Sequence, residues 1–489
     1  MRQSKQIHKH IHHHAKHGSN HHQGHSRRRK SFILNLKEYR QELLSDISVF
    51  QKVKLTLNRF GPGIITGASD DDPSGITTYT QAGARFGLQT LWTALLSFPL
   101  MAGIQEMCGR IGLVTGQGLT KVIKKHYPKW VIYLVGFVSV PAIILNIAAD
   151  LAGMGAVANM LVPAVPTWIF IILSALLIMF SLVLFSYKKI ESILKWLTLV
   201  LLVYLIVPFF IKLDWAEVLL ATLVPHIEFS KEYIAIIVAI LGTTISPYLF
   251  FWETSLEVEE HQSKKADQDY NSSLLKNGGD VDNHISSEEG GEILNITKQD
   301  ISEMRQDNNL GMFISNFVMF FIILTAGIVL NKNGVTNIET VQQAANALRP
   351  LAGDSAYLLF AAGVIGTGFL AVPVLAGACG YIISEMFDWK EGMSYKFKQA
   401  RGFYEVICFC ILLGLGLNIS GIDPIQGMIW SAIVYGLTAP ILIGIILHIA
   451  NREDIMGKWK NGWISNLLGG SGFFLMILAA LALVITTFR

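Results

Sequence analysis

Eleven apolar segments alternate with short polar stretches along the chain, and each is close to the ~20 residues that a membrane-spanning helix needs. Their approximate limits are 58–86, 88–111, 130–161, 166–186, 192–212, 232–256, 310–331, 356–385, 402–421, 424–449 and 464–487. A helix that is apolar on all sides is either buried or spans a membrane. The pattern therefore predicts an all-α polytopic membrane protein with about eleven transmembrane helices.

A polar run at 69–75 interrupts the first apolar segment and contains three adjacent carboxylates, Asp70, Asp71 and Asp72. Insertion scales assign a cost of about 2.5–3.5 kcal/mol to an acidic residue at the centre of a spanning helix. Such residues are retained where they have a function. Pro73 has no backbone donor, and Gly75 is a poor helix former. We expect the helix to break at Pro73 and Ser74.

The sixth apolar segment contains a similar interruption at 242–248, which includes Pro247. Paired discontinuous helices in corresponding positions of two halves indicate a transporter built from inverted repeats. The ends of the half-helices then meet near the membrane midplane, where carbonyl and side-chain oxygens can bind an ion. An ordinary proline kink is the alternative, and the three aspartates of the first break make it the less favoured one.

The basic residues of the connecting loops test the number of spans. Every second loop is rich in them: Lys121, Lys124, Lys125 and Lys129; Lys188, Lys189 and Lys195; Lys390, Lys396, Lys398 and Arg401; Arg452, Lys458 and Lys460. The loops between these carry few or none. Basic loops remain in the cytosol. We expect a multi-pass protein of the plasma (inner) membrane with a cytosolic N-terminus and, because the number of spans is odd, an external C-terminus.

Two polar segments divide the apolar chain. Residues 1–57 hold nine of the fourteen histidines and are expected to form a disordered, basic cytosolic tail with an approach helix. Residues 257–307 are acidic and are expected to form a disordered cytosolic loop. Helices one to six then occupy 58–256, and helices seven to eleven occupy 308–489.

The composition excludes a soluble domain. Only 15% of the 489 residues are charged, whereas soluble domains carry about 25%. The four cysteines lie in apolar stretches, so we expect buried thiols rather than disulfides. We find no nucleophile–base pair and no phosphate-binding glycine loop. The chain is therefore not expected to be an enzyme or to need a cofactor, and nucleic acid is not an expected partner.

Several motifs in a fixed order resemble those of the Nramp family of divalent-metal transporters, over about residues 59–487. They are Gly61-Pro62-Gly63 followed by Asp72-Pro73, then Gln81–Ala84, Arg110–Gly116, Ile147–Ala152 and Pro247. The resemblance implies a LeuT-like fold, which has two inverted five-helix repeats with broken helices one and six.

The chain departs from the family pattern where the family binds its metal. The family's Asp-Pro-Gly-Asn in helix one keeps its aspartate as Asp72, but Gly75 replaces the asparagine. In helix six, Thr243 stands at the position of the alanine carbonyl ligand and Ser246 at that of the methionine. A thioether favours soft transition metals, and a hydroxyl does not. The implied site is all-oxygen, centred on Asp72, with Asp70 and Asp71 as further charges around it.

The positions that the family associates with proton movement also differ. Tyr248 replaces a histidine after Pro247, and Gly153 replaces a glutamate in helix three. Asp150 is kept, and two roles are open for it: titration on a proton route, or pairing with an inner polar group such as Arg110. The second is favoured. Proton coupling is therefore doubtful, although Asp150, Arg110 and Tyr248 are the candidates for a proton route or gate.

The resemblance is closest to the Nramp-related magnesium transporter branch. Magnesium usually keeps several waters and is held by one or two carboxylates. We expect a secondary transporter or facilitator that carries Mg²⁺, with Mn²⁺ as the second ion, by alternating access. Its partners are the divalent ion and the lipid bilayer; the oligomeric state is open, with a monomer favoured. The alternatives are a proton-coupled Mn²⁺/Fe²⁺ Nramp importer and, from another class, a sodium-coupled amino-acid symporter.

Overall fold

The computed structural model describes residues 62–184, 203–211, 213–277, 296–421 and 423–488. These residues form helices and connecting turns, without a strand among them. The predicted tail at 1–57 and most of the predicted span at 192–212 lie outside the described residues.

The helices follow the predicted spans closely. The first half of the chain forms α4 (Pro62–Asp70), α5 (Pro73–Phe86), α6 (Trp92–Thr115), α7 (Leu119–His126), α8 (Lys129–Leu161), α9 (Thr167–Leu184), α11 (Val203–Ile206), η2 (Val207–Phe210), α12 (Trp215–Leu223), α13 (Lys231–Thr244) and α14 (Pro247–Asn277). The second half forms α15 (Lys298–Val329), η3 (Asn331–Asn333), α16 (Val341–Ala345), η4 (Asn346–Leu348), α17 (Arg349–Ala352), η5 (Gly353–Ser355), α18 (Ala356–Phe387), α19 (Arg401–Leu417), η6 (Asn418–Ser420), α20 (Pro424–Asn451), α21 (Glu453–Met456), η7 (Gly457–Trp459) and α22 (Trp463–Thr487).

Seven helices in the described part of the chain are long and apolar enough to cross a membrane. They are α8, α9, α13 with α14 (Lys231–Ala266), α15, α18, α20 and α22. The broken pair α4 and α5, the helix α6 and the 17-residue α19 lie at three further predicted spans. The all-α polytopic membrane fold is confirmed.

Both predicted breaks are present. Helix α4 ends at Asp70 and α5 begins at Pro73, and α13 ends at Thr244 and α14 begins at Pro247. A proline fits the first position of a helix because no hydrogen bond is required from its nitrogen there. Each proline therefore starts a new helix at its break.

The prediction of a disordered loop at 257–307 is wrong at both of its ends. Helix α14 continues to Asn277, and α15 already begins at Lys298, where Thr297 and Asp300 form a capping box. The segment after the sixth span is rich in Glu, Gln and Lys, which favour helix in water. Lys264 and Glu260, four residues apart, add an ion pair of 2.7 Å. Residues 278–295 lie outside the described part.

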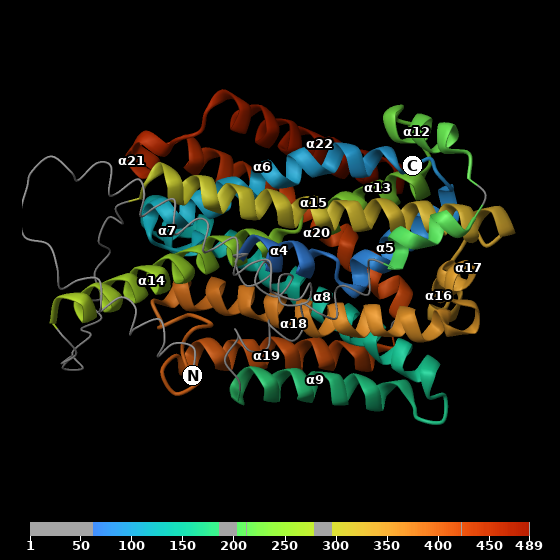
Figure 1. Cartoon of the computed structure of the whole chain (residues 1–489), viewed down its shortest axis with the longest axis horizontal. Coiled ribbons are helices and arrows are strands. Elements are labelled where there is room, and N and C mark those ends of the chain that lie inside the picture. Colours follow the sequence, from blue (N-terminus) through green and yellow to red (C-terminus); the bar gives the residue numbers. More distant parts are fainter. Residues whose placement is uncertain (1–61, 185–202, 212, 278–295, 422, 489) are drawn as a thin grey trace, which may run out of the picture. The chain divides into compact units, whose positions relative to one another are not determined.

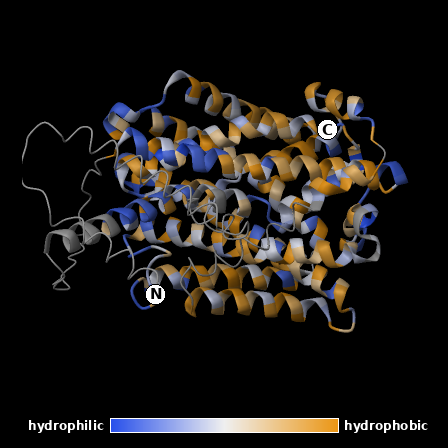
Figure 2. Ribbon diagram, in the orientation of Figure 1, coloured by the Kyte–Doolittle hydropathy of each residue, from blue (hydrophilic) through white to orange (hydrophobic). Residues whose placement is uncertain are grey.

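The broken pair α4 and α5 lies between α15 and α18 and contacts both (Figure 1). Short elements gather at the two ends of the long helices: α7 and α21 at one end, and α12, α16 and α17 at the other (Figure 1). We call these the α7 end and the α16 end. Helices α9 and α22 are largely hydrophobic (Figure 2), and large side chains such as Phe180 and Phe474 are exposed on them. Such surfaces suit contact with lipid.

Candidate metal site

The two helix breaks face each other. A Cβ added at Gly75 on α5 would lie 3.1 Å from the hydroxyl oxygen of Thr243 on α13 and 3.2 Å from Asp72 Oδ1. The hydroxyl of Tyr248 donates to the carbonyl oxygen of Ser69 at 2.8 Å, which joins the start of α14 to the end of α4. Asp72, Gly75 and Thr243, which the sequence singled out separately, are therefore together in space.

Asp72 is the N-cap of α5 and is buried. Its Oδ1 accepts a hydrogen bond from the backbone nitrogen of Gly75 at 2.6 Å and from the hydroxyl of Ser74 at 2.8 Å. Its Oδ2 accepts from Asn146 Nδ2 at 2.7 Å. Capping by an aspartate requires the chain to turn immediately before Pro73, because the N-cap itself is not helical. The break thus holds this carboxylate in one orientation, with Oδ1 on the side of Gly75 and Thr243.

Asn146 on α8 was missed in the sequence. Its amide nitrogen also lies 3.5 Å from Asp150 Oδ2, and Asp150 Oδ1 accepts from the backbone nitrogen of Ser74 at 3.2 Å. Two carboxylates, Asp72 and Asp150, therefore meet the N-terminus of α5, where the helix dipole favours negative charge. The spacing of Asn146 and Asp150, two polar residues four apart in an apolar helix, was the available signal.

Asp70 and Asp71 face a different neighbour. The hydroxyl of Ser315 on α15, also missed in the sequence, lies 2.8 Å from Asp70 Oδ2 and 3.5 Å from Asp71 Oδ1. Asp70 also interacts with Ser246 at the second break. Asp70 Oδ1 is buried and has no hydrogen-bond partner among the described residues. The groups that hydrogen-bond to these two carboxylates in the described part are thus hydroxyl groups.

Ser246 and Thr243 belong to the unwound end of α13. The hydroxyl of Ser246 donates to the carbonyl oxygen of Thr243 and lies 3.4 Å from that of Gly242. Helices α4 and α13 both end here, and the C-terminal end of a helix favours a cation. Among the described residues, no group of three or more His, Cys, Asp and Glu side chains is arranged to hold a metal ion. A cation at this place would therefore need hydroxyl, carbonyl or water oxygens beside the carboxylates.

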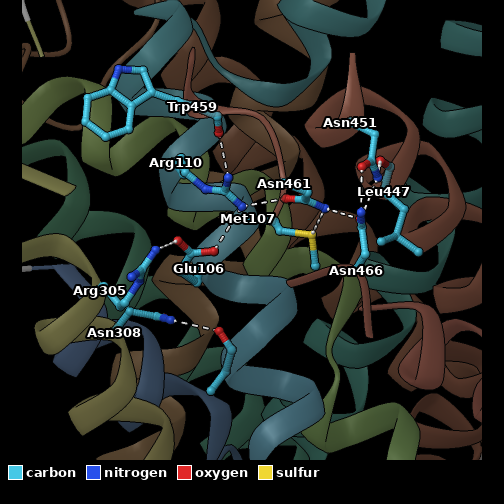
Figure 3. A network of polar contacts seen from close by, with 11 residues as sticks. Glu106, Met107, Arg110, Arg305, Asn308, Leu447, Asn451, Trp459, Asn461 and Asn466 are labelled. Atoms are coloured by element: carbon cyan, nitrogen blue, oxygen red, sulfur yellow. Dashed lines mark hydrogen bonds and ion pairs between the residues drawn. The ribbon is translucent and has the colours of Figure 1, made fainter. Parts of the chain in front are cut away.

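Arg110 is not part of this site, and the favoured pairing of Asp150 with Arg110 is wrong. Arg110 donates to Glu106 at 3.1 Å, to the carbonyl oxygen of Trp459 at 2.6 Å and to Asn461 Oδ1 at 2.6 Å (Figure 3). Glu106 also accepts from Arg305 on α15 at 2.9 Å (Figure 3). Arg110 pairs with Glu106 because the two side chains have opposite charge and lie one turn apart on the same face of α6.

A family model described as natural resistance-associated macrophage protein-like matches residues 63–486. The divalent metal cation transporter MntH of Vibrio campbellii is 27% identical over 439 residues, covering 86% of this chain and 90% of the relative. The MntH of Klebsiella pneumoniae is 24% identical over 436 residues, covering 85% and 91%.

Solved structures show a similar fold. The crystal structure of the Eremococcus coleocola manganese transporter, in complex with an aromatic bis-isothiourea substituted compound, gives a TM-score of 0.63 at 15% identity, covering 90% of this chain and 88% of that one. MhsT in complex with L-phenylalanine gives 0.57 at 12% identity, covering 87% and 98%. These similarities confirm the LeuT-like fold. Since the family model spans nearly all of the described residues, the chain belongs to the Nramp family.

Proposed function

We propose that this protein carries a divalent metal cation across the membrane by alternating access, with Asp72 as the central ligand. One observation supports this most strongly. Asp72 is a buried carboxylate at a helix break, and its Oδ1 lies on the same side of Gly75 as the hydroxyl of Thr243 in the second break. Broken helices with oxygen groups at the membrane midplane are how transporters of this type bind cations.

The names of the relatives bear on the identity of the ion. Two are named divalent metal cation transporters, and one similar structure is of a manganese transporter. They favour manganese, and so the proton-coupled Mn²⁺/Fe²⁺ importer, over the expected magnesium transporter. Manganese is also compatible with carboxylate, carbonyl and water ligands. We therefore propose Mn²⁺ as the primary cargo.

Magnesium is the second candidate because of the donors at the two breaks. The side chains of Asp72, Thr243 and Ser246 offer oxygen only, and Gly75 adds no bulk beside them. A hydrated Mg²⁺ held by one or two carboxylates needs such room. Asp70 and Asp71 would add negative charge beside the ion in either case.

Uptake into proteoliposomes distinguishes the candidates. Purified full-length protein is assayed with Mn²⁺ and with Mg²⁺, with the pH inside the vesicles recorded. Mn²⁺ uptake accompanied by acidification, without Mg²⁺ flux, would support the proton-coupled importer and contradict the magnesium hypothesis. Mg²⁺ flux without acidification would support the magnesium hypothesis.

A sodium-coupled amino-acid symporter remains the alternative from another class. The resemblance to MhsT, at 12% identity, shows the fold alone. Uptake of labelled amino acids, with no uptake of either metal, would support it.

We also propose, from the basic loops, that the N-terminus is cytosolic and the C-terminus external. In this orientation, the α7 end of the helices faces the cytosol.

A further inference from the structure

Helix α4 connects the candidate metal site to the α7 end of the molecule through a series of polar contacts. Starting from the break, Ser69 accepts from Tyr248 on α14 at 2.8 Å. One turn away, the hydroxyl of Thr66 donates to Glu253 Oε2 on α14 at 2.6 Å. A further turn away, the backbone nitrogen of Gly63 donates to Asp307 Oδ2 on α15 at 2.7 Å. We call this series the α4 seam.

The contacts of the α4 seam are evenly spaced. They involve positions 69, 66 and 63, so that successive steps are about 4.5 Å apart along the helix axis and lie near one face. Helices α14 and α15, which supply the partners of α4 in the seam, are apolar on average over their membrane spans. A polar series of this kind, which starts at an ion site and ends near the loops, provides the groups that a partly hydrated cation needs on its way out.

Glu253 is the unusual member of the seam. It is fully buried, and its Oε1 has no hydrogen-bond partner in the described part of the chain. A Cβ added at Gly109 on α6 would lie 3.5 Å from this oxygen. Gln105 is one turn before Gly109 on the same face and is 1% exposed, and neither polar atom of its amide has a partner among the residues that the structure describes. Unpartnered buried polar atoms are rare because they are costly, so those of Glu253 and Gln105 indicate a ligand that enters between α6 and α14.

The charges around Glu253 are predominantly negative. Glu257 and Glu260 on its own helix and Asp307 on α15 interact with it electrostatically. Glu106 on α6 is already paired with two arginines. Lys264 is the basic group that acts on this cluster, and it is bonded to Glu260. A site of this charge attracts cations and repels anions.

We propose that Glu253 is a second cation-binding carboxylate on the release side of the Asp72 site, where Oε1 receives the hydrated divalent ion as it leaves along α4. This inference rests on the proposed function. A single carboxylate suffices for an ion that keeps several of its waters, as Mg²⁺ does where one or two carboxylates bind it. Thr66 holds the other oxygen of Glu253, so Oε1 is the atom that is available.

Manganese binding to purified full-length protein tests the inference in the Asp72→Ala background. That variant should retain one weak Mn²⁺ site by isothermal titration, and the double variant Asp72→Ala/Glu253→Gln should lose it. Glutamine keeps the size of the side chain and an acceptor for Thr66. An Asp72→Ala protein without weak binding, or a double variant that still binds, would overturn the inference.

Transport supplies a second readout. Glu253→Gln alone should leave Mn²⁺ affinity and KM within about twofold of wild type while kcat falls at least about tenfold, the scale of losses seen when a group near a metal is removed. Glu253→Asp, which keeps the charge, should recover most of the rate. The control is Glu405→Gln on α19, whose exposed carboxylate pairs with Arg401 away from the α4 seam and which should transport normally.

Three outcomes would overturn the role of Glu253: normal turnover in Glu253→Gln, equal losses in the Gln and Asp variants, or unchanged Mn²⁺ flux with lost proton movement. The last would assign the carboxylate to protons. If the wild-type protein carried neither Mn²⁺ nor Mg²⁺, the proposed function itself would fail, and this inference with it.

Discussion

Replacing Asn146 with alanine should weaken metal binding although Asn146 is not expected to touch the metal. Its amide nitrogen holds Asp72 Oδ2 at 2.7 Å. The other carboxylate oxygen, Oδ1, is the one on the side of Gly75 and Thr243. Without Asn146, the Asp72 carboxylate keeps its cap on α5 but loses the contact that fixes its plane. Part of the binding free energy must then be used to orient it.

The size of the effect follows from that one contact. A hydrogen bond to a charged group contributes about 1.5–3 kcal/mol. A tenfold change in affinity corresponds to about 1.4 kcal/mol. The expected loss is therefore roughly ten- to a hundredfold in Kd, the range found for groups that orient metal ligands.

Isothermal titration of purified full-length protein with Mn²⁺ measures this loss. The matched control is Asn418→Ala, because Asn418 also donates to α8, at the carbonyl oxygen of Ala148 (3.1 Å), but does not contact Asp72. Its affinity should equal that of wild type. A folded Asn146→Ala protein that binds Mn²⁺ as tightly as wild type would refute the orientation of Asp72 by α8.

Two further substitutions probe the site and its support. Ser246→Met should raise the affinity for Mn²⁺ or Cd²⁺ relative to Mg²⁺, because a thioether prefers softer metals; titration with the three ions measures the ratio. Gly67→Ala should destabilise the packing of α4 on α15 by about 1–3 kcal/mol, as overpacking does, because the new Cβ would lie 2.3 Å from the carbonyl oxygen of Gly311. Thermal unfolding in detergent measures it.

Each of these substitutions has a result that would contradict its prediction. An unchanged ratio of affinities in Ser246→Met would separate ion selectivity from position 246. Gly470→Ala on α22 is the control for Gly67→Ala, because nothing lies within 4 Å of its added Cβ. If both glycine variants unfolded at the wild-type temperature, the close approach of α4 to α15 would be wrong.

The features that could be predicted from sequence are those with a local cause. Pro73 and Pro247 each begin a helix, whereas Pro99, Pro141, Pro373 and Pro440 lie inside helices. Both breaks were predictable because polar residues accompany the proline at each of them. The spans follow from apolar length alone. The helical continuation of α14 was missed because acidic composition suggested a loop, whereas pairs such as Glu260 and Lys264 stabilise a helix in water.

The features that were missed depend on contacts between distant elements. Asn146 and Ser315 contact the aspartates from α8 and α15. The spacing of Asn146 and Asp150 marks a polar face on α8, but nothing local specifies that this face meets the break. Arg110 was assigned to Asp150 because both are charged residues in apolar spans. In the structure it is paired within its own helix, with Glu106. The sequence shows which residues share a face of one helix, but it does not show which other helix that face contacts.

Uptake of Mn²⁺ by Asp72→Ala in proteoliposomes tests the central claim most directly. Asp72 is the carboxylate held at the junction of the two breaks, so its removal should abolish uptake while the protein remains folded in the membrane. Asp423→Ala, which removes an exposed cap at the start of α20, is the control and should transport normally. Wild-type uptake by a folded Asp72→Ala protein would contradict the account.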